Sequence, residues 1–561
     1  MRWPRRRAGW AAAALALTQA VLLARTAWDK SDTGDEPVYI GAAALLWAHR
    51  DFAYNNPAPV LPKWGYAVAL RLVDPWIATA PDDWGTVISH MLWARRTERL
   101  RLNLFAARSA TILVTVLGGL LLWAAARRFG ERAALVTQAL WCVSPSVLAN
   151  GSLATLDGWL AAMMCLVLWT GVRLFERPTL RRFCESGAAL GLALGCKVTA
   201  LGVAPVLVAA GVVALRRQGR TGRALWITAA EYTANLAGAA FLVLWSLYGL
   251  TVGPVSTELL AQRFGWTART FGPLPFPAWI SGLLHQWALG SAGHRTYLFG
   301  QVATHGWWWF YLAALAFKTT IGAQALALAR LVSWIRRRPA RAELTIDAAL
   351  LAYPALLLVL MSQAATQTGI RYLLPAFPFA MVWLGRALPD LGRAFGRKAE
   401  GVALACVLLA AGESLSVHPH HLMFFNRWAG GPVGGPRYMI LSDDWGQDQR
   451  RLGEWIRDRG LPGVFYTYYA GMPRKWGVEY RPPPCTPRRG TYALQAVEVH
   501  RPRRIEPGCL DWLTVEPPDE RIGYSIYIYQ VNKERLERLV AERGTLAPFW
   551  RSGAPPAAGA P

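Results

Sequence analysis

The sequence has few charged residues, and acidic residues are the scarcer kind. Only 17% of its 561 residues are charged, and 35 acidic residues stand against 60 lysines and arginines. A soluble protein of this length needs a larger charged surface, and a content of 53% hydrophobic residues exceeds what one soluble core takes up. The composition therefore predicts a polytopic membrane protein.

Cysteine is scarce as well. The seven cysteines are scattered along the chain, and none of them forms a CxxC motif, which argues against a structural zinc site. No glycine-rich nucleotide-binding loop is evident either. The sequence requires no cofactor and indicates no metal site, although it does not exclude a divalent cation.

The excess of basic residues does not predict a nucleic-acid partner. The arginines fall in short clusters between apolar runs, rather than on one amphipathic face or in one basic tail. Such clusters are typical of the loops that stay on the cytoplasmic side of a membrane. We therefore expect the chain to contact a lipid bilayer and no nucleic acid.

The apolar runs predict about eleven transmembrane helices, because ~20 apolar residues cross a bilayer core of ~30 Å. The first run, 8–24, follows four arginines and is interpreted as a retained anchor, with a cleaved signal peptide as the alternative. A long apolar segment over 187–215 has arginines on both flanks, so we interpret it as a helical hairpin with Lys197 at its exoplasmic tip. The remaining runs cover 108–126, 133–149, 156–174, 223–250, 307–331, 344–362, 372–388 and 401–416.

Placing the basic loops in the cytoplasm leaves three long stretches on the exoplasmic side. They are a first loop over 26–107 with amphipathic helices, a second loop over 251–306, and a tail over 417–561. Strand-like runs at 463–469 and 524–531, with a helical pattern over 448–458, predict a small α/β domain in the tail. The predicted organisation is thus a mainly α transmembrane domain over 1–416 and a C-terminal α/β domain over 417–561. Cys485 and Cys509 fall in the tail, and whether they pair stays open.

The strongest indication of a site is the acidic pair Asp35 and Glu36, just after the first apolar run. Carboxylates are costly to hold near lipid and usually serve a reaction or a transported ion. The positive-inside rule places Asp157, at the start of a later apolar run, on the same side of the membrane as Asp35. We therefore expect the two acids to share a cavity.

The order of several short motifs resembles the GT-C superfamily of membrane glycosyltransferases, in the branch of protein O-mannosyltransferases and lipid A aminoarabinose transferases. No single motif would be convincing, but together they cover about residues 1–460. The motifs are the acidic pair at 35–36, NNPAPVLPK at 55–63, LATLD at 153–157, GCKVTAL at 195–201, GWWWFY at 306–311, KT at 318–319, GIRYLLP at 369–375, HPHH at 418–421, AGGP at 429–432 and DWGQD at 444–448.

The chain departs from this family at two positions. It has Ala58-Pro59-Val60 where the family commonly has His-Pro-Pro, and Pro62 where some relatives carry a metal-binding glutamate. A bound metal is therefore not expected near Lys63. A cluster of His418, His420 and His421 is interpreted as lining a cleft or packing the tail, rather than as a metal site.

The resemblance implies catalytic roles for three acidic residues. Asp35 matches the catalytic aspartate, which takes the proton of an acceptor hydroxyl, and its alternative role is to cap a helix that begins near Pro37. Glu36 is expected to support the site or the structure. Asp157 is expected to orient Lys63 or to bind the acceptor, with a helix N-terminal charge as its alternative role.

The resemblance also implies a phosphate site and a cleft. Lys63 and Arg371, and less strongly Lys197, are the expected ligands of the donor phosphate, because fixed cations stabilise the charge that collects there. Arg371 has an alternative role as an interfacial residue that extends its charge into water. The residues expected to line the cleft are Tyr39, Asn56, His420 and Tyr372.

The sequence therefore predicts an integral membrane glycosyltransferase. The expected reaction transfers a monosaccharide from a polyprenyl phosphate to an exoplasmic hydroxyl of a protein, glycan or lipid, with inversion at the anomeric carbon. The resemblance places it in the inner membrane of a bacterium, with the active site and the tail on the periplasmic side. A secondary transporter is the alternative from another class, but its acids usually lie near the bilayer midplane in repeated halves. A noncatalytic scaffold of the same fold is a third alternative.

Overall fold

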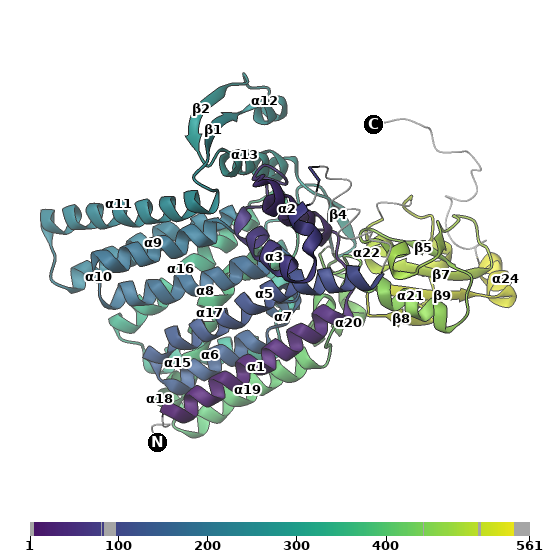
Figure 1. Ribbon diagram of the computed structural model, residues 1–561. Coiled ribbons are helices and arrows are strands. Elements are labelled where there is room, and N and C mark those ends of the chain that lie inside the picture. The colour runs from purple at the N-terminus through teal and green to yellow at the C-terminus, as the bar shows by residue number, and fades with distance from the viewer. Residues whose placement is uncertain (1–4, 80, 83–96, 441, 503–505, 543–561) are drawn as a thin grey trace. The chain divides into compact units, whose positions relative to one another are not determined.

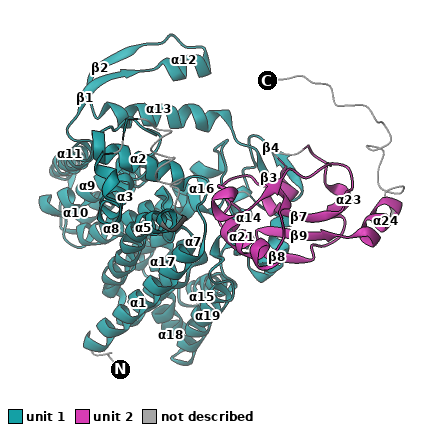
Figure 2. Cartoon of the chain, turned by 45° about the vertical axis from the view of Figure 1, so that its right-hand side comes forward, with its two compact units in different colours: residues 1–443 teal, residues 444–561 magenta. Residues whose placement is uncertain are grey.

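The computed structural model describes residues 5–79, 81–82, 97–440, 442–502 and 506–542. The chain divides into two compact units, Met1–Asp443 and Asp444–Pro561 (Figure 2). The first unit extends beyond the boundary predicted after residue 416, because the segment that follows packs on it. For example, the side-chain amide of Asn426 donates to the carbonyl oxygens of Ala316 and Thr319.

The first unit is a bundle of long helices with shorter elements at one end. Figure 1 shows α1, α5, α6, α8, α9 and α11 side by side, with α2, α3 and α13 gathered near the end of α11. The helices are α1 (Arg5–Asp29), α2 (Glu36–His49), α3 (Val60–Val73), α5 (Thr97–Ala126), α6 (Glu131–Val143), α7 (Pro145–Gly151), α8 (Leu156–Glu176), α9 (Leu180–Leu194), α10 (Ala204–Arg217), α11 (Gly222–Leu247), α12 (Glu258–Phe264), α13 (Pro277–Ala292), α14 (Phe310–Lys318), α15 (Ile321–Arg337), α16 (Arg341–Ser362), α17 (Phe377–Gly385), α18 (Ala387–Phe395), α19 (Lys398–Leu415) and α20 (Gly431–Gly434).

Among the described residues, six helices are long and apolar enough to cross a membrane, and two bent pairs bring the number to eight. The chain is therefore an integral membrane protein, but the predicted eleven crossings are not all found. Two of the predicted runs form shorter helices, since α9 has 15 residues and α17 has nine. The run predicted over 133–149 breaks before Pro145, where α6 and α7 meet at 59°, because proline cannot donate to the preceding helical turn.

The segment predicted as a helical hairpin consists of α9, a break at 195–197, a 3-10 turn (Val198–Val203) and α10. Glycines on α9 let it approach α11 closely. A Cβ atom at Gly187 would lie 2.1 Å from the carbonyl oxygen of Leu236, and one at Gly191 would lie 2.6 Å from that of Ala240. The glycine series thus serves backbone packing, and Lys197 stands in the break between the two helices.

Two β-hairpins lie between α11 and α14. Strands β1 (Val252–Ser256) and β2 (Thr270–Pro275) are antiparallel and enclose α12, and β3 (Thr296–Leu298) pairs with β4 (Gln301–Ala303). Figure 1 shows β1, β2 and α12 standing out beyond α13. These elements occupy the stretch predicted as the second loop.

The second unit has the predicted α/β architecture. Its five-stranded sheet has the order β6-β5-β7-β9-β8, with parallel pairs around β5 and antiparallel pairs around β9. The predicted helix and both predicted strands are confirmed as α21, β5 and β9, and Cys485 forms a disulfide with Cys509. The elements are α21 (Gln449–Asp458), β5 (Val464–Thr467), β6 (Tyr480–Arg481), β7 (Gly490–Gln495), α22 (Ala496–His500), α23 (Asp511–Thr514), β8 (Glu520–Ile522), β9 (Ile526–Val531) and α24 (Lys533–Glu542).

Candidate active site

Asp35 lies directly before the first turn of α2, with a side chain that is 42% exposed. It occupies the N-cap position, but its side chain makes no capping hydrogen bond. Its backbone carbonyl alone accepts from the amides of Val38 and Tyr39. The capping alternative is therefore not realised, and the carboxylate stays available for another partner.

That partner is Arg371, which links Asp35 to a second acid. The Nη1 atom of Arg371 lies 3.4 Å from Oδ2 of Asp35 and 3.5 Å from Oδ2 of Asp157. The other carboxylate oxygen of Asp157 accepts from the ammonium of Lys197 at 2.8 Å. The ring of Tyr372 borders both cations, with its centroid 4.1 Å from Nζ of Lys197. We call Asp35, Asp157, Lys197 and Arg371 the mixed-charge cluster.

Each member of the mixed-charge cluster comes from a different part of the chain. Asp157 lies in the first turn of α8, and Lys197 precedes the 3-10 turn before α10. Arg371 lies in a 3-10 helix, Ile370–Ala376, which follows Gly369 with its positive φ of 85°. The fold thus joins four of the predicted site residues, and the structure agrees with the expectation that the two acids share one region.

Tyr39 lies within electrostatic reach of the same cluster. Burial raises the pKa of its hydroxyl, the charge of Asp35 raises it further, and Arg371 opposes both effects. For Arg371, burial disfavours the charged form, but the carboxylates of Asp157 and Asp35 raise its pKa above the ordinary value. The guanidinium therefore stays charged, and Tyr39 stays neutral.

Glu36 has a different environment from that of its neighbour. Its side chain is fully buried and accepts hydrogen bonds from Nε and Nη2 of Arg108 at 2.7 and 2.6 Å. Its carboxylate also accepts from the backbone amides of Thr33 and Ala154, at 2.9 and 2.7 Å. Glu36 thus joins the start of α2 to α5 and to the turn before α8.

Lys63 binds the backbone of the loop that precedes α3. Its ammonium donates to the carbonyl oxygens of Tyr54 and Asn55, at 2.8 and 3.0 Å, and closes the loop before α3. Burial lowers the pKa of this ammonium to about 7, with Asp51 opposing the shift. Asn56 lies in the same loop, where its carbonyl oxygen would be 2.1 Å from a Cβ atom at Gly282.

The histidine cluster packs within the first unit. Nδ1 of His420 contacts the ammonium of Lys30, and the rings of His418 and His421 lie 5.2 Å apart. Burial lowers the pKa of His421 to about 3, so its imidazole is neutral. Within the part of the chain that the structure describes, no group of three His, Cys, Asp or Glu side chains could hold a metal ion.

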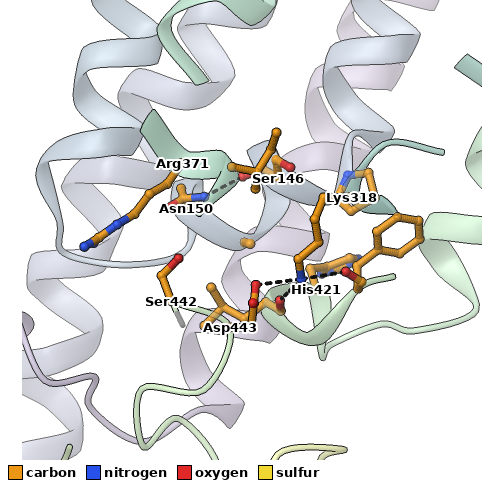
Figure 3. A pocket seen from close by; sticks show the side chains of 12 residues that line it. Ser146, Asn150, Lys318, Arg371, His421, Ser442 and Asp443 are labelled. Atoms are coloured by element: carbon orange, nitrogen blue, oxygen red, sulfur yellow. Dashed lines mark hydrogen bonds and ion pairs between the residues drawn. The ribbon is translucent and has the colours of Figure 1, made fainter. Parts of the chain in front are cut away.

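A small, partly open pocket lined by both polar and apolar side chains adjoins Arg371. The ammonium of Lys318 forms an ion pair with Asp443 at 2.6 Å and donates to the carbonyl oxygen of Phe424 at 2.8 Å. Figure 3 shows that the side chain of Arg371 extends away from Lys318. The labelled lining residues are Ser146, Asn150, Lys318, Arg371, His421, Ser442 and Asp443.

The sequence analysis missed most of this pocket. Lys318 belongs to the KT motif at 318–319, whereas Asp443 lies in the predicted tail, where the sequence indicates no function for it. The ion pair between them joins residues 125 positions apart, and only the packing of 417–443 on α14 brings them together. The one available signal was the position of Asp443 beside the DWGQD motif. Of that motif, Asp448 precedes α21 without a side-chain capping bond and accepts from Ser525 instead.

The comparisons with known proteins point to glycosyl transfer. Residues 98–246 match the model of the dolichyl-phosphate-mannose-protein mannosyltransferase family. No curated protein matches the chain. The matched segment spans α5 to α11 and includes Asp157 and Lys197 of the mixed-charge cluster.

Several solved structures resemble the chain at low sequence identity. ArnT from Cupriavidus metallidurans bound to undecaprenyl phosphate is 15% identical over 93% of this chain and 97% of that chain, with a TM-score of 0.49. The S. cerevisiae Pmt1-Pmt2 protein O-mannosyltransferase complex bound to its sugar donor is 11% identical over 85% and 96%, with a TM-score of 0.49. The Archaeoglobus fulgidus oligosaccharyltransferase tethered with an acceptor peptide is 12% identical over 86% and 60%, with a TM-score of 0.43. The family match confirms the predicted resemblance to the GT-C superfamily and the prediction that the chain is a membrane glycosyltransferase.

Proposed function

We propose that the chain transfers a monosaccharide from a polyprenyl-phosphate donor to the hydroxyl group of an acceptor. The observation that carries this proposal is the mixed-charge cluster, in which Arg371 lies between Asp35 and Asp157. A base and fixed cations within a few ångströms of each other are what this reaction needs. The description of the matched family, which names a dolichyl-phosphate sugar, supports a lipid-linked donor.

Asp35 is the base in this proposal. Its partly exposed carboxylate lies 3.4 Å from Arg371, and its side chain is not used to cap α2. It takes the proton of the acceptor hydroxyl while the hydroxyl oxygen bonds to the anomeric carbon. The bond between that carbon and the phosphate oxygen breaks, and direct attack from the opposite face inverts the configuration.

Arg371 and Lys197 stabilise the leaving phosphate. Negative charge collects on its oxygens as the glycosidic bond breaks, and cations that are already in place need no reorganisation at that moment. Asp157 holds Lys197 at 2.8 Å and Arg371 at 3.5 Å, so it positions both cations. The ring of Tyr372 confines Lys197 on another side.

The pocket beside Arg371 is the proposed place for polar groups of a substrate. Its lining offers hydroxyl, amide and carboxylate groups from Ser146, Asn150, Ser442 and Asp443, which suit the hydroxyls of a sugar. Lys63 is left out of the phosphate site, because its ammonium is engaged by two loop carbonyls.

The proposed reaction takes place on the exoplasmic side of the membrane. The arginines at the ends of α5, α8 and α10 support this orientation, since basic loops are retained in the cytoplasm. Asp157 starts α8, at the end opposite to Arg173. The acceptor is accordingly an exoplasmic protein, glycan or lipid.

The proposal is tested with purified protein in lipid nanodiscs and a panel of polyprenyl-phosphate sugars. Mass spectrometry follows donor consumption by wild type, by Asp35→Asn and by Asp458→Asn, an exposed aspartate on α21 that serves as the control. We expect wild type and the control to consume one donor of the panel and Asp35→Asn to leave it intact. Equal consumption by Asp35→Asn would contradict its role as base.

A further inference from the structure

A second, apolar crevice lies between α8, α10 and α16. It is a shallow, open crevice, and apart from one arginine its lining is apolar, with Val167 and Gly171 from α8, Leu207 from α10, and Ala349 from α16. The exception is Arg128, which follows α5. Figure 1 shows α8, α10 and α16 as neighbouring helices of the bundle. The crevice thus has an apolar body with a cationic residue at its edge.

A polar, open pocket continues from this edge. The two cavities share Arg128 and Val172, and the polar pocket adds Arg127, Trp169 and Arg173. The guanidinium of Arg173 stacks on Trp169, with 4.4 Å between its central carbon and the ring centroid. An apolar cavity and a basic cavity therefore meet at Arg128 and Val172.

The charge of the polar pocket is positive. Three arginines face two glutamates in its lining, and the ion pairs of Arg128 with Glu176 at 3.2 Å and of Arg127 with Glu131 at 2.9 Å are partly exposed. Arg173 pairs with Glu185 at 3.3 Å, and this carboxylate is shared with Arg181 and Arg182. A fourth guanidinium, that of Arg217, lies 4.6 Å from the ring of Phe175, which lines the apolar crevice. Partly exposed pairs of this kind exchange partners at little cost, so an anion can bind the arginines.

This place is separate from the mixed-charge cluster. Asp157 lies in the first turn of α8 and Arg173 in its last turn, 16 residues later. A helix rises 1.5 Å per residue, so the two lie about 24 Å apart along the helix axis. A ligand of the basic pocket is therefore not positioned to react at Asp35.

We propose that the two cavities together bind one anionic phospholipid, with its phosphate group against Arg128 and Arg173 and one acyl chain in the crevice between α8, α10 and α16. A lipid with an apolar chain and a negative headgroup is complementary to an apolar cavity that adjoins a basic one. Basic pockets between membrane helices bind such headgroups. Arginine binds phosphate through two parallel hydrogen bonds. The bound lipid fills the gap between helices that would otherwise expose an apolar cavity.

The test is native mass spectrometry of the full chain in detergent, with phosphatidylglycerol and phosphatidylcholine of identical acyl chains offered together. We expect wild type to retain phosphatidylglycerol preferentially, and we expect the double variant R128Q/R173Q to lower that preference by roughly fivefold for each arginine removed. The control double variant R220Q/R223Q makes the same charge change at exposed arginines outside the pocket and keeps the preference. The variant R128K/R173K shows whether the charge alone preserves part of it.

The acyl chain is tested with a matched pair on α16. Ala349→Phe fills the crevice and is expected to remove the retained lipid, whereas Ala348→Phe, at an exposed neighbour outside the crevice, is expected to keep it. Equal retention of the two lipids by wild type would overturn the proposal. It would also be overturned if R128Q/R173Q kept the full preference, or if Ala349→Phe retained as much lipid as Ala348→Phe.

Discussion

Two adjacent residues, Asp35 and Glu36, differ in burial and in how closely their partners bind them. Around Glu36 every partner is close and the side chain is fully buried, with Arg108 and two backbone amides within 2.9 Å. Around Asp35 the carboxylate is 42% exposed, and its contact with Arg371 measures 3.4 Å. The carboxylate of Glu36 uses its oxygens in hydrogen bonds that hold the fold together, whereas the carboxylate of Asp35 can still accept a proton from a substrate.

The largest effect is expected from removing the free acid. Asp35→Asn keeps the shape of the side chain but cannot accept a proton, so the transfer rate is expected to fall by about 10²- to 10⁴-fold. The melting temperature should stay close to that of wild type, because no buried hydrogen bond is lost. Transfer rates from mass spectrometry and melting curves of the same samples check both expectations. A wild-type transfer rate in Asp35→Asn would contradict the contrast between Asp35 and Glu36.

Removing the cation between the two acids is expected to have the next largest effect. Arg371→Gln leaves the developing phosphate charge without its bridging guanidinium, and we expect a loss of about 10²- to 10³-fold in turnover. Arg371→Lys keeps the charge but not the geometry that reaches Asp35 and Asp157, so it should recover only part of the rate. If Arg371→Gln changed only melting temperature, Arg371 would be a structural residue.

Glu36→Gln is expected to act on stability instead of chemistry. The change leaves the buried charge of Arg108 without its carboxylate, which costs about 3–5 kcal/mol of folding stability. The molecules that remain folded should transfer sugar at nearly the wild-type rate. Chemical denaturation and turnover per folded molecule measure the two effects, and a stable but inactive Glu36→Gln would reverse the assignment.

These contrasts show how far sequence alone carries the site. The resemblance implied Asp35, Asp157, Arg371 and, less strongly, Lys197 as site residues, and the structure brings these four side chains together. The resemblance did not predict the hydrogen-bond partners of Lys63. The carbonyl oxygens of Tyr54 and Asn55 face its ammonium only because of the conformation of their loop, which the sequence does not reveal.

The fold was predicted to a similar extent. Apolar runs located most of the long helices, and period-two patterns located β5 and β9 in the second unit. Hydropathy does not predict where a helix ends, and α9 ends after 15 residues. It also does not predict the bend of 107° between α14 and α15. Such breaks depend on packing partners far away in sequence, which is also why the partner of Lys318 was missed.

The smallest expected effect concerns Lys63 and pH. Burial lowers its pKa in the folded state to about 7, well below the ordinary value of 10.5, so above pH 7 the unfolded chain binds more protons than the folded one. Stability should therefore rise as pH increases from 7 toward 10, and Lys63→Met should flatten that rise. Melting temperatures between pH 7 and 9 check this. An identical pH dependence in Lys63→Met would show that the ammonium is not the group responsible.

The most direct test of the account compares the two neighbouring acids in one assay. Nanodiscs of Asp35→Asn and of Glu36→Gln are loaded with the donor that wild type consumes, and sugar transfer is measured in a single turnover per folded molecule. The account predicts that Asp35→Asn holds the donor without transferring the sugar, while folded Glu36→Gln transfers it. Transfer by Asp35→Asn at the wild-type rate would contradict the central claim that Asp35 is the base.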